Sequence, residues 1–139
     1  MKERNYLFIS EISKDIRFLF SFVHPDIADF IACQCACETA YGRSTIFLEN
    51  KNLFGMKVAK QRLSSCIGVN REHALYYDSE QSIMDYFLWL SYHGFTQADL
   101  RYSLDDFIRK FPWTKYCPTS GYLDSIKSIY KSFKSYTNG

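Results

Sequence analysis

The sequence lacks any apolar run long enough to cross a membrane, since a spanning helix needs about 20 predominantly apolar residues. The most apolar early stretch, residues 16–31, is interrupted by His24, Pro25, Asp26 and Asp29. The first residues also lack the uninterrupted apolar segment of a signal peptide, because charged side chains recur through them. We therefore expect no membrane insertion, and we expect synthesis in the cytoplasm.

The sequence also lacks a charge excess of one sign. Seventeen Lys and Arg residues stand against 15 Asp and Glu residues, which leaves a net charge of +2. Nucleic-acid-binding domains concentrate basic residues in a patch or stripe, so no nucleic-acid partner is expected. The 47% content of hydrophobic residues excludes intrinsic disorder. The 139 residues contain no repeat or linker and match one domain, residues 1–139.

Cysteine is present, but in an odd number, and five cysteines cannot form a complete disulfide framework. Cys33, Cys35 and Cys37 alternate within a helical pattern, where Cys35 points away from the other two. Structural zinc sites draw four ligands, usually as two separated pairs. The three residues are therefore expected to be small buried hydrophobes, and no metal or other cofactor is expected.

Aromatic residues are abundant, with 11 Tyr, 12 Phe and 2 Trp making up 18% of the chain. This surplus suggests a packed core together with a surface that stacks on flat ligands, including sugars. Apolar residues at helical spacing and capping residues predict a mainly α (α+β) fold. The expected helices cover residues 6–22, 26–40, 79–93, 103–110 and 120–135.

Residues 43–77 show no long helical period. Asparagines and glycines punctuate this segment, so it is expected to form loops and short strands between the second and third long helices.

Glu38 lies near the end of the second expected helix, one turn before Gly42. The negative end of the helix dipole and partial burial among small apolar residues would both raise the pKa of this carboxyl group. A raised pKa is what a general acid needs near neutral pH. Taken alone, the residue fits an ordinary solvent-facing glutamate better, but the surrounding sequence changes that balance.

Four motifs follow one another along nearly the whole chain. They read ETAYGRS at 38–44, KNLFGMK at 51–57, YDS with SIMDY between 77 and 86, and YCPTSGY at 116–122. In this order they resemble the glucosaminidase family of peptidoglycan hydrolases (glycoside hydrolase family 73). The compact middle of the chain is most similar to the short, phage-type forms of that family.

The resemblance implies a lysozyme-like helical fold with a small, irregular β-rich lobe between the second and third long helices. It implies hydrolysis of the β-1,4 bond after N-acetylglucosamine in the glycan strand of peptidoglycan. Glu38 falls on the catalytic acid of the family, which protonates the leaving glycosidic oxygen. Tyr116 falls on a tyrosine beside the reaction centre, although Cys117-Pro118-Thr119 replaces the usual A-x-D after it.

The resemblance also implies substrate-binding residues. Asn52, Phe54 and Gly55 fall on the loop that shapes the floor of the cleft, and for Phe54 core packing is an equal alternative. Tyr41 stands where the family commonly has tryptophan, and a tyrosine there can still stack on a sugar ring.

Most glycosidases use two carboxylates. Within the β-rich lobe Glu72 is the strongest candidate for the second one, ahead of Glu49 and Asp78. The alternative is that the 2-acetamido group of the substrate assists the reaction and that no second acid is needed.

Other functions stay open at this stage. The chain could be an N-acetylmuramidase or lytic transglycosylase on the same fold, or a non-catalytic cell-wall-binding or phage structural module. If it is an enzyme, a phage lysin acting on the cell wall as a monomer is the expected form.

Overall fold

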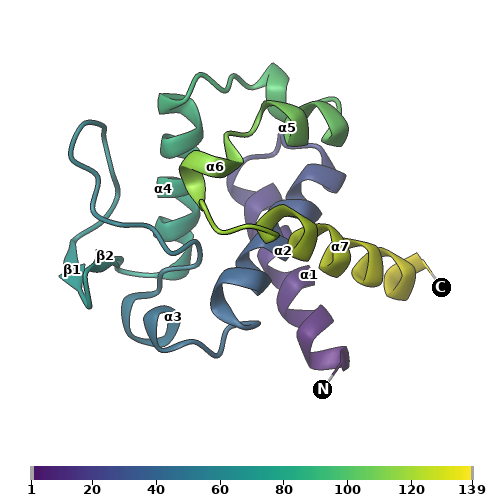
Figure 1. Cartoon of the computed structure of the whole chain (residues 1–139), viewed down its shortest axis with the longest axis horizontal. Helices are drawn as coiled ribbons and strands as arrows, with labels where there is room; N and C mark the ends of the chain where they lie inside the picture. Colours follow the sequence, from purple (N-terminus) through teal and green to yellow (C-terminus); the bar gives the residue numbers. More distant parts are fainter. Residues whose placement is uncertain (1, 139) are drawn as a thin grey trace.

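The structure is a computed structural model that describes residues 2–138, and it is mainly helical (Figure 1). The described part contains, in chain order, α1 (Lys2–Leu19), α2 (Pro25–Thr39), α3 (Thr45–Asn50), β1 (Gly68–Asn70), β2 (His73–Leu75), α4 (Ser79–Tyr92), the 3₁₀ helix η1 (Ala98–Leu100), α5 (Leu104–Lys110), α6 (Trp113–Tyr116) and α7 (Tyr122–Asn138). This arrangement is consistent with the lysozyme-like fold that the resemblance implies. Within residues 2–138, every helix is too short or too polar to span a bilayer.

Helix α2 forms the centre of the molecule. Ten of its 15 residues are buried, and half of these are alanine or cysteine. Such small side chains let neighbouring helices approach closely, and α1 and α7 both pack against α2. Cys33 and Cys35 are fully buried and Cys37 is half-buried, as expected for small hydrophobes. Residues 2–138 contain no group of His, Cys, Asp or Glu that could hold a metal ion.

Local hydrogen bonds fix both ends of α2. Nδ1 of His24 accepts a hydrogen bond from the Asp26 amide at 3.0 Å, and Pro25 occupies the first helical position, where a missing N–H is harmless. The left-handed residue at the helix end is Ala40, and Tyr41 and Gly42 after it also have positive φ.

The other helix boundaries show which features of the sequence predicted the helix ends correctly. Asp78 caps α4 by accepting a hydrogen bond from the Gln81 amide, and Ser103 caps α5 in the same way. The expected first helix was misplaced, since α1 begins and ends earlier, and α7 begins two residues later than expected. Helices α3, α6 and η1 were not expected, because each is only three to six residues long and carries no amphipathic period of its own.

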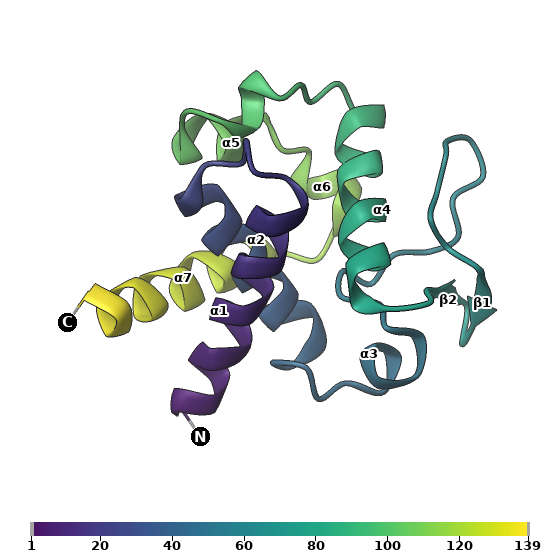
Figure 2. The same ribbon diagram turned by 180° about the vertical axis from the view of Figure 1, so that it is seen from behind.

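The small lobe contains the β1–β2 hairpin, which lies on the opposite side of the molecule from α7 in both views (Figure 2). Arg71 and Glu72 form its two-residue turn, and both have the positive φ that such tight hairpin turns require. The buried side chain of Asn50 donates to the carbonyl oxygens of Asn70, His73 and Ala74 and so holds α3 against the hairpin.

A long loop, residues 57–67, precedes the hairpin and is fastened to α4. Arg62 forms an ion pair with Asp85 at 2.7 Å, and the two side chains are 9% and 0% exposed. The hydroxyl of Tyr76 also donates a short hydrogen bond to Asp85. Ser65 adds a hydrogen bond to the Gln81 carbonyl oxygen at 2.6 Å. The loop therefore has a fixed position beside α4.

Candidate active site

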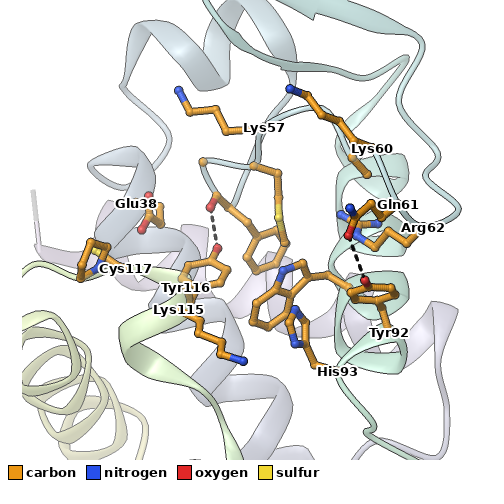
Figure 3. Close-up of a pocket in the computed structure, with 16 residues that line it drawn as sticks. Glu38, Lys57, Lys60, Gln61, Arg62, Tyr92, His93, Lys115, Tyr116 and Cys117 are labelled. Carbon is orange, nitrogen blue, oxygen red and sulfur yellow. Dashed lines mark hydrogen bonds between the residues drawn. The ribbon is translucent and has the colours of Figure 1, made fainter.

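A cleft with a volume of about 580 Å³ separates the small lobe from α4 and α6 (Figure 3). The loop 54–62 forms one wall, and residues 115–118 form another. Trp89, Tyr92 and His93 of α4 close the remaining side. Glu38 lies at the inner end of this cleft, next to Cys117 and Tyr116 in the view.

Glu38 is the only carboxylate among the described residues that line the cleft. It is the next-to-last residue of α2, so the rigid central helix carries it to this position. Burial raises the pKa of its carboxyl group above the ordinary value of 4.5, while a hydrogen bond from Tyr122 and the charge of His73 partly oppose this effect. A raised pKa lets the carboxyl group keep its proton to higher pH, as a general acid requires.

Gly55 lies directly against this carboxylate. A Cβ atom at position 55 would lie 2.7 Å from Oε2 of Glu38, which is closer than any real contact. The φ of +68° at Gly55 is also one that other residues rarely adopt. The glycine therefore lets the backbone of the lobe approach the carboxylate and confines its position.

Tyr116 connects the two sides of the cleft. Its hydroxyl donates a hydrogen bond of 2.5 Å to the carbonyl oxygen of Phe54, as Figure 3 shows. Its ring packs against the rings of Trp89 and Tyr122. Burial raises the pKa of Tyr116 well above its usual value, so the phenol stays neutral and keeps donating. Tyr116 therefore fixes the distance between α6 and the lobe loop beside Glu38.

A chain of hydrogen bonds reaches Glu38 from inside the core. The hydroxyl of Tyr86 donates to Oε1 of Gln34 at 2.8 Å, and Nε2 of Gln34 donates to the hydroxyl oxygen of Tyr122 at 3.3 Å. Because the oxygen of Tyr122 accepts from the amide, its proton is available to Glu38, whose pKa the Tyr122 hydroxyl lowers. Gln34 and Tyr86 are fully buried, so this part of the chain of hydrogen bonds is shielded from solvent.

We expect the Tyr122→Phe variant to shift the alkaline limb of the activity profile to higher pH. The hydroxyl of Tyr122 stabilises the ionised carboxylate, so its loss raises the pKa of Glu38 further. If Glu38 acts as an acid, activity is present below that pKa and is lost as the pH rises through it. The measurement is kcat/KM against pH.

Tyr130→Phe is the matched control, because Tyr130 lies on the same helix and outside the cleft lining. An unchanged alkaline limb in Tyr122→Phe would contradict the coupling of Tyr122 to Glu38.

The structure brings Glu38, Phe54, Gly55 and Tyr116 together in the cleft lining. Phe54 is 1% exposed and stacks on Tyr86 with ring centroids 4.1 Å apart, so core packing accounts for most of its surface.

Asn52 is buried beneath the cleft floor and does not line it. Its Nδ2 donates to the carbonyl oxygens of Met56 and Ala74, and its Oδ1 accepts from the amides of Phe54 and Met56. Asn52 therefore shapes the loop that carries Phe54 and Gly55.

Tyr41 and Glu72 are not among the residues that line the cleft. Tyr41 is half-buried after the end of α2 and packs against the hydrophobic core. Glu72 is exposed at the tip of the β1–β2 turn, because a two-residue turn directs its side chains to solvent.

Sequence reasoning missed several residues of the site. Tyr122 is the last residue of the fourth motif, and that position was the available signal for it. Gln34 carried no signal, since a glutamine in an apolar helix has no distinctive spacing. The lysines of the cleft, Lys57, Lys60 and Lys115, look like ordinary solvated charges in the sequence.

Comparison with known proteins places these features in a family. The glucosaminidase family, described as mannosyl-glycoprotein endo-beta-N-acetylglucosaminidase, matches residues 25–135. Searches among curated proteins and among solved structures found no match. The family match begins at the first residue of α2 and ends within α7, so it includes Glu38 and every residue that lines the cleft. The chain therefore belongs to the glucosaminidase family of glycoside hydrolases.

Proposed function

We propose that the protein is an endo-β-N-acetylglucosaminidase that hydrolyses the β-1,4 bond after N-acetylglucosamine in peptidoglycan. One observation carries the proposal: a carboxyl group with a raised pKa lies in the cleft, held by Gly55 on one side and Tyr122 on the other. The family match supports the same class of reaction.

In the proposed first step, Glu38 donates its proton to the glycosidic oxygen as the bond from that oxygen to C1 breaks. Because no second carboxylate is present among the described lining residues, the carbonyl oxygen of the substrate's own 2-acetamido group attacks C1 and forms a cyclic oxazolinium. The ionised Glu38 then takes a proton from water as the water oxygen adds to C1 and reopens the ring. The anomeric configuration is retained.

In this scheme Tyr116 and Gly55 contribute by fixing the positions of the lobe loop and of the Glu38 carboxyl group. The hydrogen bond from Tyr116 to Phe54 holds the lobe loop in place, and the close approach of Gly55 to Glu38 restricts the space around the carboxyl group. Correct positioning of a reacting group accounts for a large share of enzymatic rate.

Product analysis tests the proposed bond specificity. Purified peptidoglycan is digested, the new reducing ends are reduced with borohydride, and the muropeptides are identified by mass spectrometry. We expect reduced N-acetylglucosamine at the new ends. Reduced N-acetylmuramic acid would indicate a muramidase, and anhydro ends would indicate a lytic transglycosylase. If folded protein binds the wall and releases no ends, a non-catalytic binding module is the correct assignment.

The role as a phage lysin and the monomeric state stay predictions. The lysin role is tested by expressing the protein inside cells together with a membrane-permeabilising protein and measuring lysis. The monomeric state is tested by measuring the molecular mass of the protein in solution.

A further inference from the structure

The cleft carries positive charge on more than one wall. Lys57 and Lys60 lie on the lobe loop, and Lys115 lies on α6, where Figure 3 shows it on the other side of Tyr116 from Lys57. All three side chains are exposed. None of them forms an ion pair with another residue in the described part of the chain, whereas the nearby Arg62 is paired with Asp85.

The charges of this cleft do not cancel. Glu38 is the single carboxylate among its described lining residues, and its raised pKa keeps it protonated over a wider pH range. His93, on the α4 side, experiences the resulting field. Its pKa is lowered first by burial and then by the charges of Lys115 and Arg62. A cleft lined by one sign of charge concentrates ligands of the opposite sign.

The lysines also stand close to the reacting group along the chain. Lys57 follows two residues after Gly55, which contacts Glu38, and Lys115 directly precedes Tyr116. All three lysines line the same cleft as Glu38, so an anion bound by them would lie in the cleft where the bond is cut. Neutral sugar rings can accept hydrogen bonds from these ammonium groups, but they carry no opposite charge to pair with them.

We propose that Lys57, Lys60 and Lys115 bind carboxylates carried by the N-acetylmuramyl residues of the strand, so that the cleft selects charged strands over neutral ones. This inference rests on the proposed function. The carboxylates have two sources: the stem peptide, or the lactyl group that is left when the peptide is removed. An ammonium group is a compact point charge on a flexible stem, which suits carboxylates at variable positions along a peptide.

A polyphosphate such as nucleic acid fits the cleft less well. The three lysines surround a cleft whose inner end holds Glu38, and when ionised this group would repel a continuous run of phosphates. Carboxylates spaced on alternate sugars can meet the lysines and still leave the uncharged bridging oxygen at Glu38.

The test compares three substrates with one triple variant, Lys57→Ala/Lys60→Ala/Lys115→Ala. The substrates are strands with stem peptides, strands stripped by an amidase, and neutral chitin oligosaccharides. For the wild type we expect kcat/KM to be highest on a charged strand and to fall with ionic strength on that substrate only. In the triple variant the preference for charged over neutral substrate should fall about tenfold, mainly through KM, since each exposed ion pair is individually weak and three are removed together.

The matched control is Lys14→Ala/Lys127→Ala/Lys131→Ala, which removes three exposed lysines of α1 and α7 that lie outside the cleft. It should leave the preference unchanged. Equal urea unfolding curves for both triple variants and the wild type exclude misfolding.

Each outcome has one meaning. A preference for peptide-carrying over stripped strands identifies the stem peptide, and a preference for stripped strands identifies the lactyl carboxylate. Equal rates on both, with a lower rate on chitin, show that the lysines accept carboxylates from either source. If the cleft variant keeps the wild-type preference for charged over neutral substrate, the inference is overturned, while the proposed glycosidase activity is unaffected. Absence of hydrolysis on all three substrates overturns the proposed function instead. In that case, sedimentation with insoluble peptidoglycan still tests whether the three lysines bind the strand. Equal binding by the wild type and the cleft variant would overturn that role.

Discussion

Replacing Glu38 by glutamine is expected to lower kcat by about 10²–10⁴-fold, the usual contribution of a general acid. The amide has the shape of the carboxyl group and still accepts the hydrogen bond from Tyr122, but it cannot release a proton to the glycosidic oxygen. Because the contact with Gly55 is also preserved, KM should change little. The measurement is the rate of appearance of new reducing ends from purified peptidoglycan.

Glu72→Gln is the informative companion to this variant. Glu72 is exposed in the hairpin turn and outside the cleft lining, so its amide variant should retain most of the activity. If Glu72→Gln were as inactive as Glu38→Gln, the hairpin would have to reach the cleft during the reaction. A protein carboxylate would then replace the acetamido group as the second reactive group.

The second large effect concerns stability. Arg62→Ala should lower the free energy of unfolding by about 3–5 kcal/mol, because it leaves the charge of Asp85 buried without its cation. The Tyr76 hydroxyl remains bonded to Asp85, but one neutral donor does not replace an ion pair. Equilibrium unfolding in urea, followed by circular dichroism, measures the change.

Arg109→Ala provides the comparison. Arg109 pairs with Asp106 at the same 2.7 Å, but the two side chains are 74% and 70% exposed. Such surface pairs contribute about 1 kcal/mol or less. Equal losses in the two variants would show that burial of Asp85 is not what makes the Arg62 pair important.

The sequence was informative where structure is decided locally. The caps at Asp78 and Ser103 located the starts of α4 and α5, because a side-chain oxygen that bonds a nearby amide works in any tertiary context. The short helices α3 and α6 have too few residues to show an amphipathic period. Ser44 caps α3 by accepting a hydrogen bond from the Phe47 amide, and this was the one local signal for it.

The same distinction applies to the site. The motifs located Glu38, Gly55 and Tyr116, because residue type and order are visible in a sequence. They could not tell which way a side chain faces. Asn52 therefore looked like a substrate contact, although it bonds the backbone beneath the floor. The meeting of Gln34 with Tyr122, 88 positions apart, follows from the packing of α7 on α2 and has no local signature.

The bridge from Tyr116 to Phe54 has a consequence for how a ligand arrives. The two walls are tied by that hydrogen bond, and Phe54 is held by its stacking on Tyr86. Immobilising a flexible side chain during association costs about 0.5–1.5 kcal/mol, and here that ordering is complete once the chain has folded. Binding should therefore be close to rigid docking. Its on-rate would then follow diffusion and electrostatic attraction, with no closing motion to limit it.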